Sequence, residues 1–152
     1  DSPDRARASA LSAQMARPVL AGLGLTNEQV QAASHAIEAH SFSANVRPET
    51  REAKILQDAD RIEALGAIGI ARCFATTGAM GGALFHGLDP FGQSRPLNDK
   101  AYAVDHFKVK LLGLPETMQT LSGRKLAEDR ANVLRDFLDQ LASELDVPAS
   151  GW

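Results

Sequence analysis

The stretch from residue 53 to residue 72, AKILQDADRIEALGAIGIAR, constrains the fold more than any other part of the chain. It is the longest apolar-rich run, and its apolar residues recur with the period of a helix, so we expect one helix from about residue 50 to about residue 75. The expected core face of this helix consists of Ile55, Ala59, Ile62, Gly66, Gly69 and Ile70. The expected solvent face consists of Lys54, Gln57, Arg61 and Arg72.

Three carboxylates interrupt this stretch and do not join the solvent face. Glu63 projects near the middle of the apolar stripe, while Asp58 and Asp60 fall on its two margins. A carboxylate inside a core is costly unless it is paired or bound to a metal. The pattern fits structural acids bonded to arginines or backbone amides, and it fits oxygen ligands of a divalent cation equally well. Gly66 and Gly69 favour close approach of another helix, with a bend as the alternative.

Other apolar periodicities predict further helices and no strand. These helices cover about residues 2–21, 26–40, 100–112 and 122–145, and Thr26 with Gln29 fits a capping box at the start of the second. The expected apolar side of the first helix consists of Ala8, Leu11, Met15, Val19 and Leu20. We therefore predict an all-α fold, a compact non-repeat bundle of about five helices in a single domain spanning residues 1–152.

Residues 76–98 are dense in glycine and proline and predict a long irregular loop, with Phe85 and Phe91 as its anchors to the core. A structureless loop of this length in a compact domain is usually functional or mobile.

Two histidines and one lysine have both a structural and a functional interpretation. His40 ends the second helix, where an imidazole favours the helix dipole, and it also leads into a polar connection. His106 and Lys110 lie one turn apart, so they form either a solvated stripe or a cation pair aimed at a phosphate.

The overall composition excludes several classes of protein. A net charge of -3 without a basic stripe or an aromatic platform argues against binding of a nucleic-acid polymer. No apolar run approaches the ~18–20 residues of a membrane-spanning helix. A single cysteine, Cys73, allows no internal disulfide, which favours a cytoplasmic location. Glycine-rich helix surfaces and loops that carry phenylalanine are suited to an interface between copies of the chain, so a homo-oligomer stays open.

Three segments together resemble a small bacterial branch of the HD-domain metal-dependent phosphohydrolases. They are SHAIEAHSFSA at 34–44, EAKILQDADRIEALGAIGIAR at 52–72 and YAVDHFKVKLL at 102–112, the last followed by MQT at 118–120. The resemblance covers nearly the whole chain, and the run DADRIEALGAIG is its most specific part.

The resemblance implies an all-α fold that holds a divalent metal through a histidine, an adjacent His-Asp pair and a final aspartate. The final aspartate falls on Asp60, so Asp60 is the predicted metal ligand. Asp58, Glu63 and His40 are then the predicted catalytic residues around the metal, and Lys110 with His106 would face the substrate phosphate. Mixed histidine and carboxylate ligation suits Mn²⁺, Fe²⁺ or Mg²⁺.

The chain departs from the family pattern because it contains no His-Asp dipeptide; Asp105-His106 has the reverse order. We expect the first histidine and the His-Asp pair to precede residue 1 in a longer protein, so that this chain lacks N-terminal helices and carries an incomplete metal site. The expected function is hydrolysis of a phosphate ester or nucleotide anhydride. The alternative is a non-catalytic helical module that binds a nucleotide or a protein.

Overall fold

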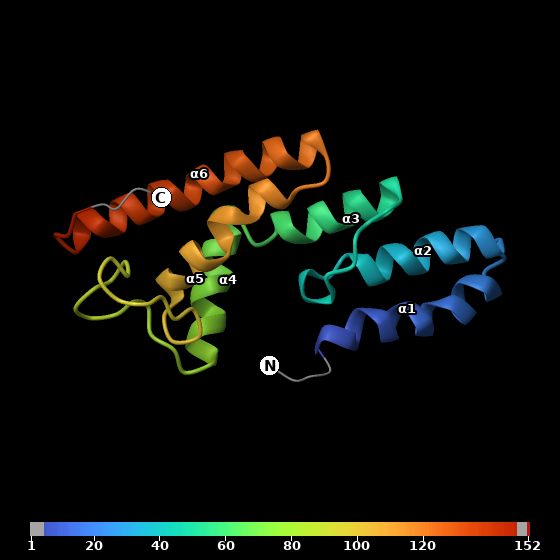
Figure 1. Ribbon diagram of the computed structural model, residues 1–152, viewed down its shortest axis with the longest axis horizontal. Helices are drawn as coiled ribbons and strands as arrows, with labels where there is room; N and C mark the ends of the chain where they lie inside the picture. Colours follow the sequence, from blue (N-terminus) through green and yellow to red (C-terminus); the bar gives the residue numbers. More distant parts are fainter. Residues whose placement is uncertain (1–4, 149–151) are drawn as a thin grey trace. The chain divides into compact units, whose positions relative to one another are not determined.

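The computed structural model describes residues 5–148 and residue 152, and its regular structure is α-helical (Figure 1). Within these residues there is no strand, only an isolated bridge between Ala83 and Tyr102. The all-α prediction is confirmed. The elements are α1 (Arg5–Gly22), α2 (Asn27–Ala39), α3 (Arg51–Ile62), α4 (Gly66–Ala79), α5 (Ala103–Val109) and α6 (Leu121–Glu144), with 3₁₀ turns η1 (Phe42–Ala44) and η2 (Leu111–Thr117).

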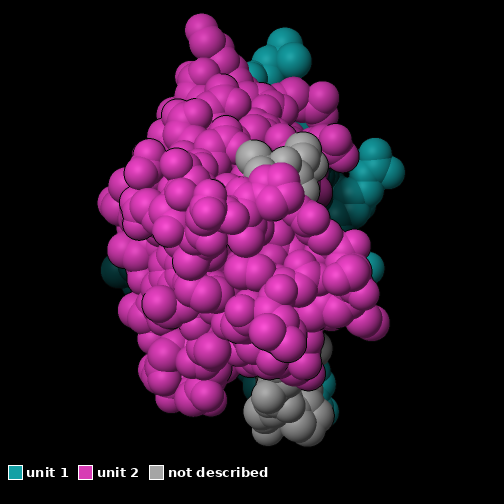
Figure 2. Space-filling model, turned by 90° about the vertical axis from the view of Figure 1, so that its left-hand side faces the viewer, with its two compact units in different colours: residues 1–61, 118–123 teal, residues 62–117, 124–152 magenta. Residues whose placement is uncertain are grey.

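The chain divides into two compact units, coloured separately in Figure 2. Unit 1 contains residues 1–61 and 118–123, and unit 2 contains residues 62–117 and 124–152. The chain passes from unit 1 to unit 2 at the last residue of α3, and again inside the first turn of α6. Two compact units can belong to one domain, so the single domain over residues 1–152 stays a prediction.

In unit 1, α1 and α2 pack side by side (Figure 1). The predicted capping box of α2 is present, because the Thr26 side chain accepts the Gln29 N–H and the Gln29 side chain accepts the Thr26 N–H. Thr50 similarly caps α3 by accepting the Ala53 N–H at 3.1 Å. Close packing follows from the size of the buried residues, which include Ala13, Val30, Ala36, Ala39 and Ala53.

The predicted apolar face of α1 is wrong, and that of α3 is wrong in part. Leu11, Met15 and Val19 of α1 are exposed by 52%, 74% and 63%, because α1 packs through Ser9 and Ala13 instead. On α3 the prediction fails in part: Ile55 and Ala59 are exposed and Gln57 of the expected solvent face is buried, whereas Ile62 is buried as predicted. Gln57 can be buried because its Nε2 donates to the Ala39 carbonyl at 2.7 Å.

The single helix predicted for residues 50–75 is also wrong, because α3 ends at Ile62 and α4 begins at Gly66. Gly66 has a φ of +68°, in the left-handed region that favours glycine, so the chain bends here. The bend, and not the favoured close approach of two helices, accounts for Gly66. It also moves Glu63 out of any continuous helical stripe.

Unit 2 has an aromatic centre in which three phenylalanines contact one another. Phe74 of α4, Phe107 of α5 and Phe137 of α6 have ring centroids 5.7–5.9 Å apart in all three pairs. Phe107 is fully buried, and Leu65, Leu134 and Leu138 of the same unit have no exposure either. The predicted helix at 100–112 is shorter than expected, since α5 ends at Val109 and η2 follows. The prediction for the last helix is confirmed by α6.

No helix among the described residues is both long enough and apolar enough to cross a lipid bilayer.

Replacement of the buried phenylalanine should destabilise the protein strongly. We expect Phe107→Ala to lower the free energy of unfolding by roughly 3–5 kcal/mol, because it opens a cavity between the other two rings. Leu88→Ala is the matched control, since Leu88 is 94% exposed and its loss should change stability by less than ~0.5 kcal/mol. Urea unfolding of both variants is the measurement, and similar midpoints would contradict the aromatic centre.

Candidate functional site

Asp58 is a buried carboxylate whose two oxygens both accept hydrogen bonds. Its Oδ1 accepts the Gln119 N–H at 2.7 Å, and its Oδ2 accepts the Thr120 N–H at 2.9 Å and the Thr120 hydroxyl at 2.7 Å. The side chain is only 3% exposed. Of the two interpretations of the acidic run, the structural one, a carboxylate bonded to backbone amides, describes Asp58.

The same contact organises the start of α6. Thr120 Oγ1 accepts the Gly123 N–H at 2.9 Å while it donates to Asp58, so the hydroxyl links the carboxylate to the first turn of the helix. A Cβ atom at Gly123 would overlap Asp58 Oδ2, which explains the glycine. The MQT segment that marked the family resemblance is therefore, in this structure, the partner of Asp58.

Asp60, the predicted metal ligand, has the opposite environment because its side chain is exposed. Two residues along a helix amount to about 200°, so Asp60 points away from the face that buries Asp58. Arg61 lies beside both acids. Burial lowers the pKa of its guanidinium, and the negative charges of Asp58 and Asp60 act in the opposite direction.

His40 lies in the same unit as Asp60, at the C-terminal end of α2. Its Nδ1 donates to the Ile37 carbonyl, which leaves Nε2 of the neutral ring with a lone pair. Gln57, one turn before Asp60, bonds to the residue that precedes His40. This hydrogen bond joins α3, one turn before Asp60, to the end of α2, one residue before His40.

The other three predicted site residues lie in unit 2. Glu63 is 73% exposed and forms a long ion pair of 3.5 Å with Arg72. His106 Nδ1 lies 3.1 Å from Asp99 Oδ2, so a carboxylate already faces this imidazole. Lys110 follows the last residue of α5, and its N–H donates to the His106 carbonyl at 3.0 Å. The roles of these residues stay predictions.

Among residues 5–148 and 152, no three His, Cys, Asp or Glu side chains are grouped so that they could hold a metal ion. The Asp58 carboxylate is engaged by the chain, because Oδ1 accepts one hydrogen bond and Oδ2 accepts two. The described residues therefore do not make a complete metal site around Asp60.

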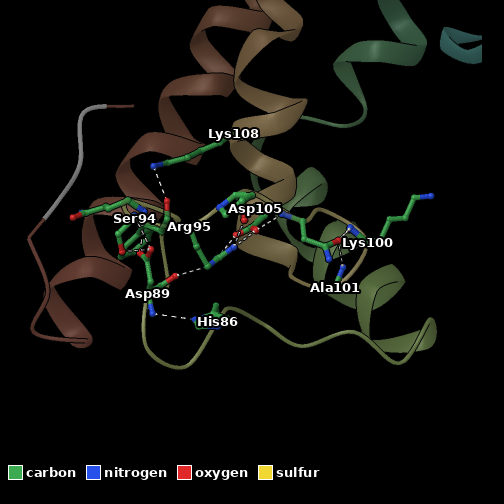
Figure 3. A network of polar contacts seen from close by, with 12 residues as sticks. His86, Asp89, Ser94, Arg95, Lys100, Ala101, Asp105 and Lys108 are labelled. Carbon is green, nitrogen blue, oxygen red and sulfur yellow. Dashed lines mark hydrogen bonds and ion pairs between the residues drawn. The ribbon is translucent and has the colours of Figure 1, made fainter.

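A polar network that the sequence did not predict orders the long loop of unit 2 (Figure 3). Arg95 and Asp105 form a bidentate pair, with Nη1–Oδ2 at 2.6 Å and Nη2–Oδ1 at 2.7 Å. Asp105 is completely buried and also accepts the Asn98 N–H. Arg95 lies in addition over the ring of Tyr102, 4.9 Å from its centroid. A buried carboxylate needs such partners to remain ionised.

A second carboxylate, Asp89, shapes the turn inside this loop. Its oxygens accept the Gln93 and Ser94 N–H groups at 2.9 and 2.8 Å, and His86 Nδ1 accepts the N–H of Asp89 itself at 3.1 Å. The backbone of Ala83 pairs with Ala101 and Ala103 and so closes the base of the loop. The loop is therefore an ordered Ω-like element rather than a structureless segment.

These hydrogen bonds change the acidity of both loop carboxylates. Backbone N–H groups of Ser94 and Gln93 lower the pKa of Asp89 to about 2. Burial alone would raise the pKa of Asp105, but the hydrogen bonds from Arg95 and Asn98 outweigh it, and the pKa is lowered. The same pairing raises the pKa of Arg95.

No family model matches the chain. It is 37% identical over 150 residues to the uncharacterised Bacillus subtilis protein YpgQ, a match that covers 96% of this chain and 65% of YpgQ. The chain thus spans less than two thirds of the length of this relative.

Solved structures show the same fold. The B. subtilis YpgQ structure in complex with ADP has a TM-score of 0.69 and 32% identity, covering 90% of this chain and 62% of that one. An HD-superfamily hydrolase from Bacillus thuringiensis has a TM-score of 0.70 and 31% identity, with 90% and 63% covered. The Lin1889 protein from Listeria innocua has a TM-score of 0.71 and 28% identity, with 98% and 71% covered. The HD-like fold is shared with all three.

Asp58 and Asp60 should respond differently to substitution. We expect Asp58→Ala to lower the free energy of unfolding by roughly 2–4 kcal/mol, because the Gln119 and Thr120 amides lose their acceptor. Asp60→Ala, two residues away on the same helix, removes an exposed carboxylate and should change stability by less than ~0.5 kcal/mol. Chemical unfolding of the two variants is the measurement. An equal decrease in the free energy of unfolding of the two variants would contradict the different environments of Asp58 and Asp60.

The free energy of unfolding should decrease as the pH is lowered through the range in which the loop carboxylates become protonated. Because the folded pKa of Asp89 is about 2 against an ordinary 3.8, its contribution is complete above pH 3.8 and is lost as the pH falls towards 2. The lowered pKa of Asp105 acts in the same direction. Urea midpoints measured from pH 5 to pH 2 should fall in this window. Asp89→Asn should flatten the slope, whereas Asp129→Asn, an exposed carboxylate on α6, should not.

Proposed function

We propose that this chain belongs to a cytoplasmic HD-superfamily phosphohydrolase that binds a nucleotide and cleaves a phosphate ester or anhydride bond. The observation that carries the proposal is the shared fold and sequence with YpgQ, whose structure was solved with ADP, and with an HD-superfamily hydrolase. Since the chain spans 65% of YpgQ, what a protein of that length would do as a whole is part of the proposal.

Within this proposal Asp60 supplies one ligand of a divalent metal, Mn²⁺, Fe²⁺ or Mg²⁺. Its exposure leaves the carboxylate accessible to an ion from solvent. His40 offers Nε2 on the neighbouring turn, and its hydrogen bond to Ile37 fixes the tautomer. A metal at Asp60 needs further ligands than those that the described residues bring together. Such a metal lowers the pKa of bound water and polarises a phosphoryl oxygen.

The remaining predicted residues take supporting roles in the proposal. Asp58 acts by holding α3 and the 119–120 turn, since its oxygens are engaged. Glu63 stays the candidate for orienting water or ligands. His106 and Lys110 stay the candidates for the substrate phosphate, with Asp99 as the carboxylate that orients the His106 ring.

A second candidate function is a non-catalytic module that binds a nucleotide or a protein. One observation favours it: the described residues contain no group of three metal-ligating side chains. Nucleotide binding and hydrolysis therefore have to be measured separately.

The decisive experiment follows ADP binding by calorimetry and phosphate release from ADP and a phosphoester panel, each with and without Mn²⁺. It uses the 152-residue chain and the complete product of its source gene. We expect metal-dependent hydrolysis by the complete product, reduced at least ~100-fold in Asp60→Ala. Glu52→Gln is the matched control, because it alters another exposed carboxylate of α3.

The outcomes separate the two candidates. Hydrolysis that depends on Asp60 supports the enzyme, and hydrolysis that is equal in Asp60→Ala removes this residue from the mechanism. ADP binding without hydrolysis under any metal supports the binding module. Neither binding nor hydrolysis would contradict both.

A further inference from the structure

Trp152, the only tryptophan in the chain, holds residues 89–94 of the ordered loop in unit 2. We call these residues the outer edge of the loop. The indole packs on the ring of Phe91, with centroids 4.9 Å apart. Its Nε1 donates to Asp139 Oδ1 of α6 at 3.0 Å, and the Lys108 ammonium of α5 lies 5.4 Å from its ring centroid. One side chain thus joins the loop to both helices.

Two further contacts reinforce the same edge. Lys108 Nζ donates to the Phe91 carbonyl at 2.8 Å, so the cation that faces the indole also holds the loop backbone. Gln93 Nε2 donates to the Pro148 carbonyl at 3.2 Å, which ties the loop to the segment after α6. Phe91 is only 1% exposed, whereas Leu88, three residues earlier, is 94% exposed. The cover over Phe91 is therefore local.

The part of the loop around Arg95, which we call its inner edge, is held in a different way. Arg95 and Asp105 form a bidentate charged pair, and Asp105 has no exposure to solvent. Removal of one partner from such a pair leaves a buried charge, which makes this anchor hard to open. The contacts of Trp152 are a ring pair, a hydrogen bond to an exposed carboxylate and a cation–π contact, each of modest strength. The outer edge should therefore open before the inner edge.

We propose that Trp152 is a latch: its indole closes over Phe91 and holds residues 89–94 against α5 and α6, and its release opens this edge of the loop about the Arg95–Asp105 anchor. The closed state is the one described here (Figure 3 shows the anchor and the Lys108 contact). The latch involves no metal and no phosphate ligand, so its test is independent of the proposed hydrolase function.

Limited digestion with chymotrypsin tests the latch, because this protease cleaves after phenylalanine and, more slowly, after leucine. The rate of cleavage after Phe91, divided by the rate after the exposed Leu88, reports how well Phe91 is covered. We expect this ratio to rise about tenfold in Trp152→Ala, from loss of the ring and cation–π contacts. Trp152→Phe keeps a ring but not the indole N–H, and it should give an intermediate ratio.

Val133→Ala is the matched control, since it trims an exposed apolar side chain of α6. Urea midpoints of all variants separate loop opening from global unfolding, and the latch requires a raised ratio at an unchanged or slightly lowered midpoint. An unchanged ratio in Trp152→Ala would overturn the proposal, as would a rise that merely follows global destabilisation.

Fluorescence gives a second measurement on the unmodified tryptophan. Trp152 should be quenched by acrylamide several-fold less than N-acetyltryptophanamide, because Phe91 and Lys108 cover its ring. Lys108→Met and Asp139→Ala should each raise the quenching constant. An indole in the unaltered protein that is quenched as readily as the free amide would overturn the latch.

Discussion

A buried carboxylate has to be satisfied wherever the chain places it, and this requirement organises both units. Asp58 lies 61 and 62 residues from the two amides that donate to it, so α3 and the turn before α6 must come together for unit 1 to form. Asp105 imposes the same condition on the loop of unit 2, which has to deliver Arg95 and the Asn98 N–H. In each unit a charge that would be costly alone specifies which distant segment lies against a helix.

Helix geometry alone places Asp58 and Asp60 on different faces of α3. Asp58 turns inward and accepts hydrogen bonds from the chain on both oxygens, while Asp60 turns outward and is exposed. Glu63 follows the end of the helix, where the chain bends at Gly66, and it pairs only loosely with Arg72. The metal-ligand role of Asp60 stays a prediction.

Local signals in the sequence predicted local structure well. The capping box at Thr26 and the extent of α6 depend mainly on residues close in sequence, whereas the predicted burial of Phe91 depends on distant partners, Lys108 and Trp152. Periodicity failed where tertiary contacts decided. It could not tell that α3 would bury Gln57 against the Ala39 carbonyl and leave Ile55 exposed, or that Gly66 would break the helix. The Arg95–Asp105 pair left no periodic trace, because it joins a loop to a helix across ten residues.

Hydrogen exchange at the backbone amides of Gln119 and Thr120 tests the central claim most directly, since these amides donate to the Asp58 carboxylate. The account predicts slow exchange in the unaltered chain, fast exchange in Asp58→Ala and no change in Asp60→Ala. Exchange at unprotected rates in the unaltered chain, or an equal effect of the two substitutions, would contradict it.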